Sequence, residues 1–340
     1  MILPLRGGAV AANADTMQGM TELTTARPDP RGQRESLRAA RTGAALAERP
    51  DLVAVQLDGD DVLRYLHSVT SQHLEDRQPG EAAEALLLSP KGRIEFALRL
   101  AVLHEGVLAD TDAGAADALA ERLRRFVFRY DVRVGPAVPG GLSIVGPAAV
   151  TTAAAAGLPV PEQPGRAGIR SGLVVQRTPL GVDLLGSQVA RVRAELAGEF
   201  PWLGPELLAA LRIEAGLPRW GLELTDDVLA EEAGLLDSHV HLDKGCYPGQ
   251  ETVARVHNLG QVQRRLAGIA CADGEPPPPR TDLLTAEGRR AGQVRGGAVH
   301  PELGAIALAY VRRTVASGQE LLAAGRPVTV TGLPFGRPAG

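Results

Sequence analysis

The amino-acid sequence predicts an α+β fold that is built from three parts. In the first part, strand patterns pair as hairpins and a helix follows them, which is typical of α+β folds rather than of doubly wound sheets. A second small unit alternates strands and helices, and the last part has short strands between Gly and Pro residues, which predicts a small barrel. The chain has 340 residues, so it exceeds the ~100–200 residues of a usual single domain.

The first unit begins with a predicted strand at residues 53–57, after which Asp60 can cap a helix. Residues 85–88 and 94–102 are predicted to form a hairpin, because apolar side chains alternate with others along the second segment. Lys91 lies at the tip of this hairpin and is either exposed or directed inward. The unit is completed by a strand at 107–109, a helix at 115–127 and a strand at 132–134.

Residues 136–141 are rich in Pro and Gly, and we interpret them as a joint between two units. Strands and helices then alternate up to residue 202, which fits a ferredoxin-like layer. A helix at 205–215 begins at a Pro and stops before Gly216. In the last part, apolar side chains alternate along 306–310, and residues 328–331 are predicted to close the barrel.

These elements predict a flexible extension at residues 1–35, a discontinuous core at 36–138 plus 203–262, a ferredoxin-like domain at 139–202, a barrel at 263–333 and a loose tail at 334–340. The extension lacks sustained periodicity and the features of a signal peptide. The true start of the protein is left open between Met1, Met17 and Met20.

Composition narrows the classes of function. A net charge of −4 and the lack of a basic block argue against a general nucleic-acid binder or a membrane-surface binder. No apolar run approaches the ~20 residues that span a bilayer. The two cysteines, Cys246 and Cys271, make no disulfide framework and fit a reducing cytoplasm.

The most informative stretch is Lys-Gly-Cys-Tyr-Pro-Gly-Gln-Glu at residues 244–251, which we call the 244–251 turn. Its glycines and proline exclude a regular helix or central strand, and Gly249 can cap the helix that follows. Free amides at that helix start, together with the Lys244 ammonium, would favour ionisation of the Cys246 thiol. The alternative is a tight turn with a small buried thiol.

Lysine usage adds a second signal. Of 36 Lys and Arg residues, only Lys91 and Lys244 are lysines, and both precede a glycine. Lysine is a compact, titratable charge on a flexible stem, whereas arginine is a wide, permanent fork. Two turns that keep lysine in an arginine-rich chain therefore suggest that this shape is needed there.

The 244–251 turn resembles the K-G-C-[FY]-x-G-Q-E signature of the YgfZ family, folate-binding relatives of the glycine-cleavage T-protein. Segments at 212–216, 232–235 and 262–266 are also similar, and the resemblance spans roughly residues 36 to 325. It implies a three-domain clover-leaf around a folate cleft. It also implies a cytoplasmic, tetrahydrofolate-dependent protein that supports maturation or repair of iron–sulfur enzymes, including tRNA-modifying ones.

Under this hypothesis Cys246 is the reactive or cluster-facing thiol and Lys244 its electrostatic partner. A folate needs apolar or aromatic walls, polar groups for its pterin edge and cations for its glutamate tail. Candidate folate-binding residues are therefore the walls Tyr247 and Trp220, the cations Arg255, Arg212 and Lys91, and the helix start at Gly249, Gln250 and Glu251.

Three alternatives remain open from the sequence. A folate-dependent aminomethyltransferase or demethylase would use Asp117, which aligns loosely with the T-protein's catalytic aspartate, while Asp183 is the possible replacement for its pterin-binding glutamate. A metal site would draw on the Cys/His cluster His239, His241, Cys246 and His257, although its spacing is not a standard zinc pattern. In a third alternative, an interaction protein, the 244–251 turn has only a structural role. The sequence does not decide whether a reaction is catalysed.

Overall fold

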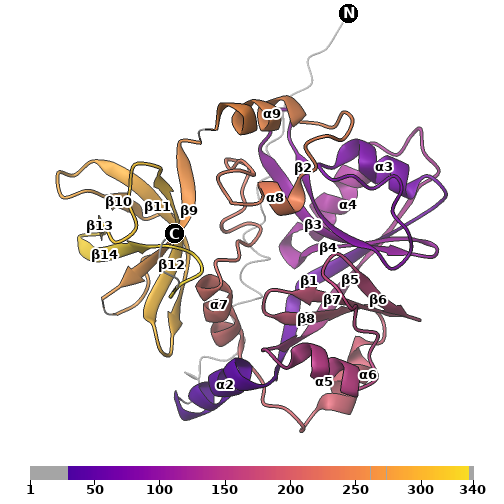
Figure 1. Ribbon diagram of the computed structural model, residues 1–340, viewed down its shortest axis with the longest axis horizontal. Coiled ribbons are helices and arrows are strands. Elements are labelled where there is room, and N and C mark those ends of the chain that lie inside the picture. Colours follow the sequence, from indigo (N-terminus) through magenta and orange to yellow (C-terminus); the bar gives the residue numbers. More distant parts are fainter. Residues whose placement is uncertain (1–29, 261, 273, 337–340) are drawn as a thin grey trace, which may run out of the picture.

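The computed structural model describes residues 30–260, 262–272 and 274–336. Within them, an eight-stranded sheet and a closed six-stranded barrel lie on either side of helix α7 (Pro205–Glu214) (Figure 1). The large sheet has the strand order β2-β3-β4-β1-β5-β8-β7-β6 and forms an open half-barrel. This architecture confirms the predicted α+β class with a small C-terminal barrel.

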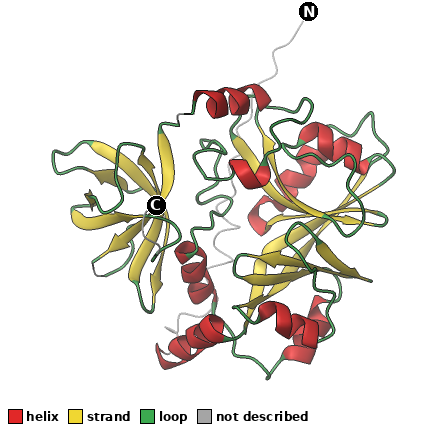
Figure 2. Ribbon diagram, in the orientation of Figure 1, coloured by secondary structure: helices red, strands yellow, loops and turns green. Residues whose placement is uncertain are grey.

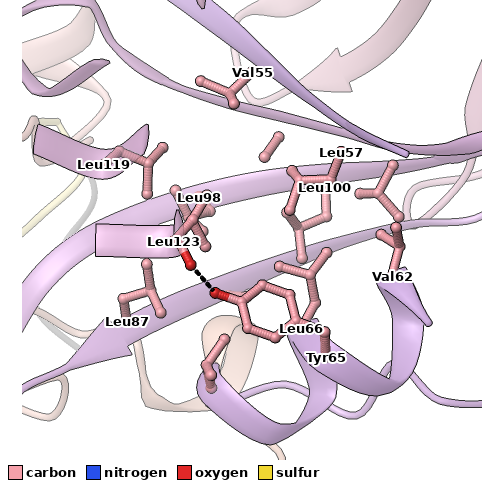
Figure 3. Packing of buried hydrophobic residues seen from close by; sticks show 14 of the residues in the cluster. Val55, Leu57, Val62, Tyr65, Leu66, Leu87, Leu98, Leu100, Leu119 and Leu123 are labelled. Carbon is pink, nitrogen blue, oxygen red and sulfur yellow. Dashed lines mark hydrogen bonds between the residues drawn. The ribbon is translucent and has the colours of Figure 1, made fainter. Parts of the chain in front are cut away.

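The first half of the sheet packs against helices α3 (Val62–Val69) and α4 (Ala116–Arg124). In Figure 3, Tyr65 and Leu66 of α3 and Leu119 and Leu123 of α4 face apolar strand residues, and the Tyr65 hydroxyl donates to the Leu123 carbonyl at 2.6 Å. The predicted hairpin at Lys91 is confirmed. The elements are β1 (Ala45–Asp58), β2 (Ala82–Leu88), β3 (Ile94–Leu103), β4 (Gly106–Asp112) and a 3-10 turn (Ala113–Ala115) before α4.

The predicted joint at residues 136–141 is wrong, because these residues lie inside strand β5 (Arg133–Val145). β5 pairs with β1 along most of its length, and the register shifts between Arg49 and Val53 and again between Val55 and Leu57. Pro136 falls in the second of these shifts, where the ladder does not need its missing N–H group. The sheet is therefore continuous, and the predicted domain limit at 138/139 falls within a strand.

The second half of the sheet carries two helices, α5 (Ala149–Ala155) and α6 (Val189–Leu196), which Figure 2 shows on one side of its strands. Their apolar side chains form one core with alternate residues of the strands. The strands are β6 (Ala167–Arg170), β7 (Leu173–Thr178) and β8 (Gly181–Leu185), and β8 pairs with β5.

Helix α2 (Pro30–Thr42) corrects part of the predicted extension, since residues 30–35 are helical rather than flexible. Pro is compatible with a first helical position, and Leu37 and Ala40 are buried with Leu207 and Leu211 of α7. An amphipathic helix that buries its apolar side is stabilised by packing rather than by propensity. Residues 1–29, and with them the question of the true start, lie outside the described residues.

The barrel closes in the order β10-β11-β12-β9-β14-β13. Its strands are β9 (Arg264–Cys271), β10 (Asp282–Leu284), β11 (Arg290–His300), β12 (Gly304–Arg312), β13 (Glu320–Ala323) and β14 (Arg326–Thr331). Helices α8 (Leu236–His239) and α9 (Gln250–Leu259) lie in the chain that leads to it. None of the helices in the described part of the chain is long and apolar enough to cross a membrane.

The predicted loose tail is also corrected. Leu333 and Phe335 pack beside Ile213, Ile306 and Leu308, and the Phe335 amide donates to the Glu214 carbonyl at 2.8 Å. Of the predicted tail, Phe335 thus packs against both the barrel strand β12 and helix α7. The last predicted tail residues, 337–340, lie outside the described residues.

Candidate functional site

The 244–251 turn packs directly against the β2–β3 turn. Gly249 adopts a left-handed conformation (φ 84°) before α9, as predicted for its cap. A Cβ at Gly249 would lie 2.6 Å from the Ser89 carbonyl oxygen, and one at Gly92 would lie 2.7 Å from the Thr252 side chain. Both glycines are thus required by close backbone approach as well as by conformation.

Lys244 is buried, with only 8% of its surface exposed. Its ammonium donates to the carbonyl of His67, to that of Thr70 at 2.6 Å and to that of Gln72 at 3.1 Å. Burial lowers the pKa of Lys244 to about 8. The ammonium therefore joins the 244–251 turn to the end of α3 and the chain after it, and within the described residues no hydrogen bond from it to Cys246 is present.

The other residues of the turn divide into core and surface. Tyr247 is 8% exposed and belongs to an apolar cluster with Leu88 and Val253, and burial raises the pKa of its phenol. The Tyr247 amide donates to Gln250 Oε1 at 3.3 Å. By contrast Cys246 is an exposed free thiol. Other exposed candidates are Glu251, Arg255 and Lys91.

A cavity of about 1070 Å³ lies away from this turn, between the sheet, α2, α7 and residues 334–335, and we call it the central cavity. Its charged lining residues are five arginines and two glutamates: Arg41, Arg77, Arg99, Arg166, Arg177, Glu84 and Glu214. Its apolar wall includes Leu100, Val145, Leu180, Leu211 and Phe335. None of the sequence-predicted site residues lines it.

Beside the central cavity lies the inner charge cluster, which consists of the buried Asp110, Ser143 and Asp183 and the partly buried Arg49 and Arg99. Arg99 pairs with Asp110 at 2.9 Å and with Asp183 at 2.7 Å. Asp183 also accepts from Ser143 at 2.5 Å and from Arg49 at 3.3 Å. Burial opposes the charge on Asp183, but these partners outweigh it and lower its pKa, whereas burial raises the pKa of Asp110.

One of the cavity arginines is not held by a carboxylate. Arg41 pairs with Glu214, Arg166 pairs with Glu81, and Arg99 belongs to the inner charge cluster. Arg177 is half-buried and donates from Nε to the Pro161 carbonyl at 2.8 Å, and among the described residues it forms no ion pair. A half-buried guanidinium without a counter-charge is a ready partner for a ligand carboxylate.

The remaining predicted residues have structural contacts outside the central cavity. Arg212 forms a bidentate pair with the buried Glu223, at 2.9 and 3.4 Å. Trp220 stacks on Phe96, with ring centroids 6.0 Å apart, and its indole donates to the Glu95 carbonyl. Asp117 is exposed in the first turn of α4.

Sequence reasoning missed Arg99, Asp110, Gln176 and Arg177, and it considered Asp183 only as a possible replacement for a glutamate. The signal was present in the period-2 pattern. Arg99 lies on the same face of β3 as Ala101, and Asp183 lies on the same face of β8 as Leu185. Ala101 and Leu185 belong to one apolar cluster inside the half-barrel. The face of β3 that looked solvent-facing is therefore an inner face, since the curved sheet folds over it.

Among the described residues, no group of three or more His, Cys, Asp or Glu side chains is placed to hold a metal ion. The rings of His67, His73 and His241 do lie together, with centroid distances of 4.9 and 5.4 Å. However, His67 Nδ1 accepts from the Leu74 amide and His73 Nε2 contacts Asp76. Each of these contacts engages one nitrogen of its ring, and the three imidazoles are not placed as a set of metal ligands.

His239 lies beside the central cavity. Its Nδ1 is 2.8 Å from Ser238 Oγ and 3.5 Å from Glu84 Oε2, and Ser238 and Glu84 line the cavity. Burial lowers the pKa of His239 to about 4 and raises that of Glu84. His239 is thus neutral in the folded chain near neutral pH, while an unfolded histidine titrates near 6.5.

This pKa difference predicts that stability falls as the pH decreases from 6.5 to 4, because the unfolded chain then binds a proton that the folded chain does not. His239→Gln should remove up to about 3 kcal/mol of that loss. Urea unfolding at a series of pH values measures the difference, with His104→Gln, at an exposed position, as control. Equal pH slopes for wild type and His239→Gln would contradict the prediction.

Comparison with known proteins agrees with this architecture. Residues 263–334 match the family described as the CAF17 C-terminal beta-barrel domain. The solved structure of the glycine cleavage system aminomethyltransferase T from Bartonella henselae superposes with a TM-score of 0.78 at 24% identity, covering 89% of each chain. At this identity the likeness establishes the fold.

Three curated relatives add sequence similarity. A chloroplastic protein of Arabidopsis thaliana named as a transferase is 22% identical over 88% of this chain and 73% of its own length. The aminomethyltransferase of Moorella thermoacetica is 41% identical over 130 residues, 35% of its length. The human mitochondrial iron-sulfur cluster assembly factor IBA57 is 39% identical over 61 residues, 17% of its length. The relatives thus include iron–sulfur assembly factors and aminomethyltransferases.

Proposed function

We propose that this chain binds a reduced folate in the central cavity and supports the maturation or repair of iron–sulfur enzymes, as a cytoplasmic protein of the YgfZ type. The observation that carries the folate half is the lining of the cavity, where arginines outnumber carboxylates beside an apolar wall. Similarity to aminomethyltransferases, which use tetrahydrofolate, and to IBA57 supports the two halves separately.

The donor set of the cavity fits the chemistry of a folate. Arg177 offers an uncompensated guanidinium to a glutamate-tail carboxylate, and the apolar wall suits the rings. Gln176 Oε1 and Arg99 Nη2 are buried at this site without partners among the described residues, and groups of this kind are satisfied by a ligand's polar edge or by ordered water. A bound tetrahydrofolate would supply or accept one-carbon units.

The proposed role of Cys246 rests on its exposure in a turn that is tied to the cavity wall. Gln72 lines the cavity, and its carbonyl accepts from Lys244, two residues from the thiol. The His241 amide donates to the Ser71 carbonyl in the same segment. A client or assembly protein can therefore reach the thiol while the cavity is occupied.

The folate half predicts that the purified chain binds tetrahydrofolate and that Arg177→Met weakens binding about ten- to hundredfold, because a charged hydrogen bond contributes about 1.5–3 kcal/mol. Isothermal titration under reducing conditions measures both affinities. Arg191→Met, an exposed arginine of α6, should leave binding unchanged. Tetrahydropteroate, which lacks the glutamate tail, should bind wild type and Arg177→Met alike. Absence of binding by wild type would remove the folate half.

The thiol half predicts that Cys246→Ser lowers iron–sulfur enzyme activity in cells towards the level of a strain without the protein. Cys271→Ala is the matched control, since Cys271 is buried in the barrel core. Tetrahydrofolate affinity should be the same for Cys246→Ser and wild type, because Cys246 does not line the cavity. Unchanged enzyme activity with Cys246→Ser would remove this half alone.

The transferase alternative is supported by the similarity to aminomethyltransferases but not by the position of its proposed catalytic residue. It assigns a central role to Asp117, and this residue is exposed on α4 and is not among the residues that line the central cavity. We therefore propose an assembly or repair factor as the main role.

A further inference from the structure

The central cavity has a single aromatic lining residue among the described residues, Phe335. The aromatic residues expected from the sequence to serve as ligand walls, Tyr247 and Trp220, are held in apolar packing elsewhere. Phe335 belongs to residues 332–336, which follow the last barrel strand and which we call the C-terminal strap. A flat ligand ring in this cavity thus has one aromatic surface available to it.

The C-terminal strap is anchored by the backbone. The Phe335 amide donates to the Glu214 carbonyl at the end of α7, at 2.8 Å. The Glu214 side chain also lines the cavity, where its Oε1 accepts from Arg41 of α2 at 2.5 Å. The strap is thereby fixed to the same rim residue that joins α2 to α7.

Two glycines make room for the strap. A Cβ on Gly268 of β9 would lie 2.7 Å from Cζ of Phe335, and one on Gly216 would lie 2.9 Å from Cβ of Leu333. Contacts this short do not occur with real side chains, so each strap residue occupies a place that only a glycine leaves open. The ring of Phe335 therefore has a defined seat against the barrel and remains half-buried at the cavity.

We infer that the C-terminal strap is part of the ligand site and that Phe335 stacks on the conjugated ring of the bound molecule. This inference rests on the proposed function, because it takes the ligand to be a reduced folate, whose pyrimidinone ring is planar. Aromatic rings favour offset or edge contacts with other rings, and such contacts contribute about 0.5–1.5 kcal/mol beyond the area that they bury. The barrel thus takes part in ligand binding through the strap.

The test compares three variants by isothermal titration with tetrahydrofolate. Phe335→Leu keeps an apolar side chain on the Gly268 seat but loses the ring, so affinity should fall about threefold to tenfold. Phe335→Tyr keeps the ring and should retain wild-type affinity. Phe128→Leu is the control, because Phe128 is 78% exposed and does not line the cavity.

Hydrogen exchange gives a second readout that does not depend on affinity. Tetrahydrofolate should slow exchange of the Phe335 amide in wild type, and should do so less in Phe335→Leu. The inference is wrong if wild type and Phe335→Leu bind tetrahydrofolate equally well and the strap gains no protection from exchange. The folate proposal would stand in that case. If wild type does not bind, both fail together.

Discussion

Asp183→Asn is expected to destabilise the protein by about 2–4 kcal/mol, because it removes a buried carboxylate that two partly buried guanidinium groups share, leaving Arg99 with Asp110 and Arg49 with Asp51. Asp183 is 3% exposed and accepts from Arg99 at 2.7 Å and from Arg49 at 3.3 Å. Asparagine keeps the shape of the side chain and a hydrogen bond to Ser143, so the loss reports on charge rather than on a cavity. Urea unfolding near neutral pH measures it.

The matched control is Asp282→Asn. Asp282 pairs with Arg290 at 2.9 Å, but both side chains are about half exposed, so removing this charge should cost no more than about 1 kcal/mol. The pKa of Asp183 is lowered in the folded chain, so its contribution is present above the unfolded pKa of 3.8 and is lost as the pH falls below it. Equal losses of stability from the two substitutions would show that burial of the Asp183 carboxylate adds nothing to its contribution.

Lys244→Met is the second substitution with a large expected effect, about 2–4 kcal/mol of destabilisation. It removes the donor shared by the His67, Thr70 and Gln72 carbonyls and leaves them without that partner in a buried place. Lys244→Arg should not restore stability, because a planar fork does not fit a site that holds a compact ammonium.

Lys91→Met is the control for this experiment. Lys91 is the other lysine of the chain, also precedes a glycine, and is exposed at the tip of the β2–β3 turn, so its replacement should change stability by less than about 0.5 kcal/mol. Circular dichroism during urea unfolding gives both values. Equal stability of Lys244→Met and wild type would show that the buried ammonium contributes little.

The two lysines also show what lysine usage in the sequence predicts and what it does not. Their retention correctly indicated a special requirement at Lys244, where three carbonyls need a compact donor. It did not indicate what the ammonium contacts, because His67, Thr70 and Gln72 are more than 170 residues away along the chain. The same signal at Lys91 corresponds to an exposed turn.

The apolar pattern of the strands does not predict the contacts of the inner charge cluster. Alternation along β3 correctly placed Ile94, Phe96 and Leu98 in a core. The pattern predicts one buried face and does not describe the opposite face, where Arg99 lies among alanines. Only the curvature of the sheet brings β3 close enough to β8 for Arg99 to pair with Asp183, 84 residues away.

The sequence by itself determined the α+β class, the hairpin at Lys91, Gly249 as the cap of α9 and the closed C-terminal barrel, because each depends on local periodicity or on backbone freedom. The tertiary structure alone decided where the central cavity lies and which side chains line it. The central cavity combines the sheet, α2, α7 and the C-terminal strap, and no local pattern specifies which side chains such distant segments bring together.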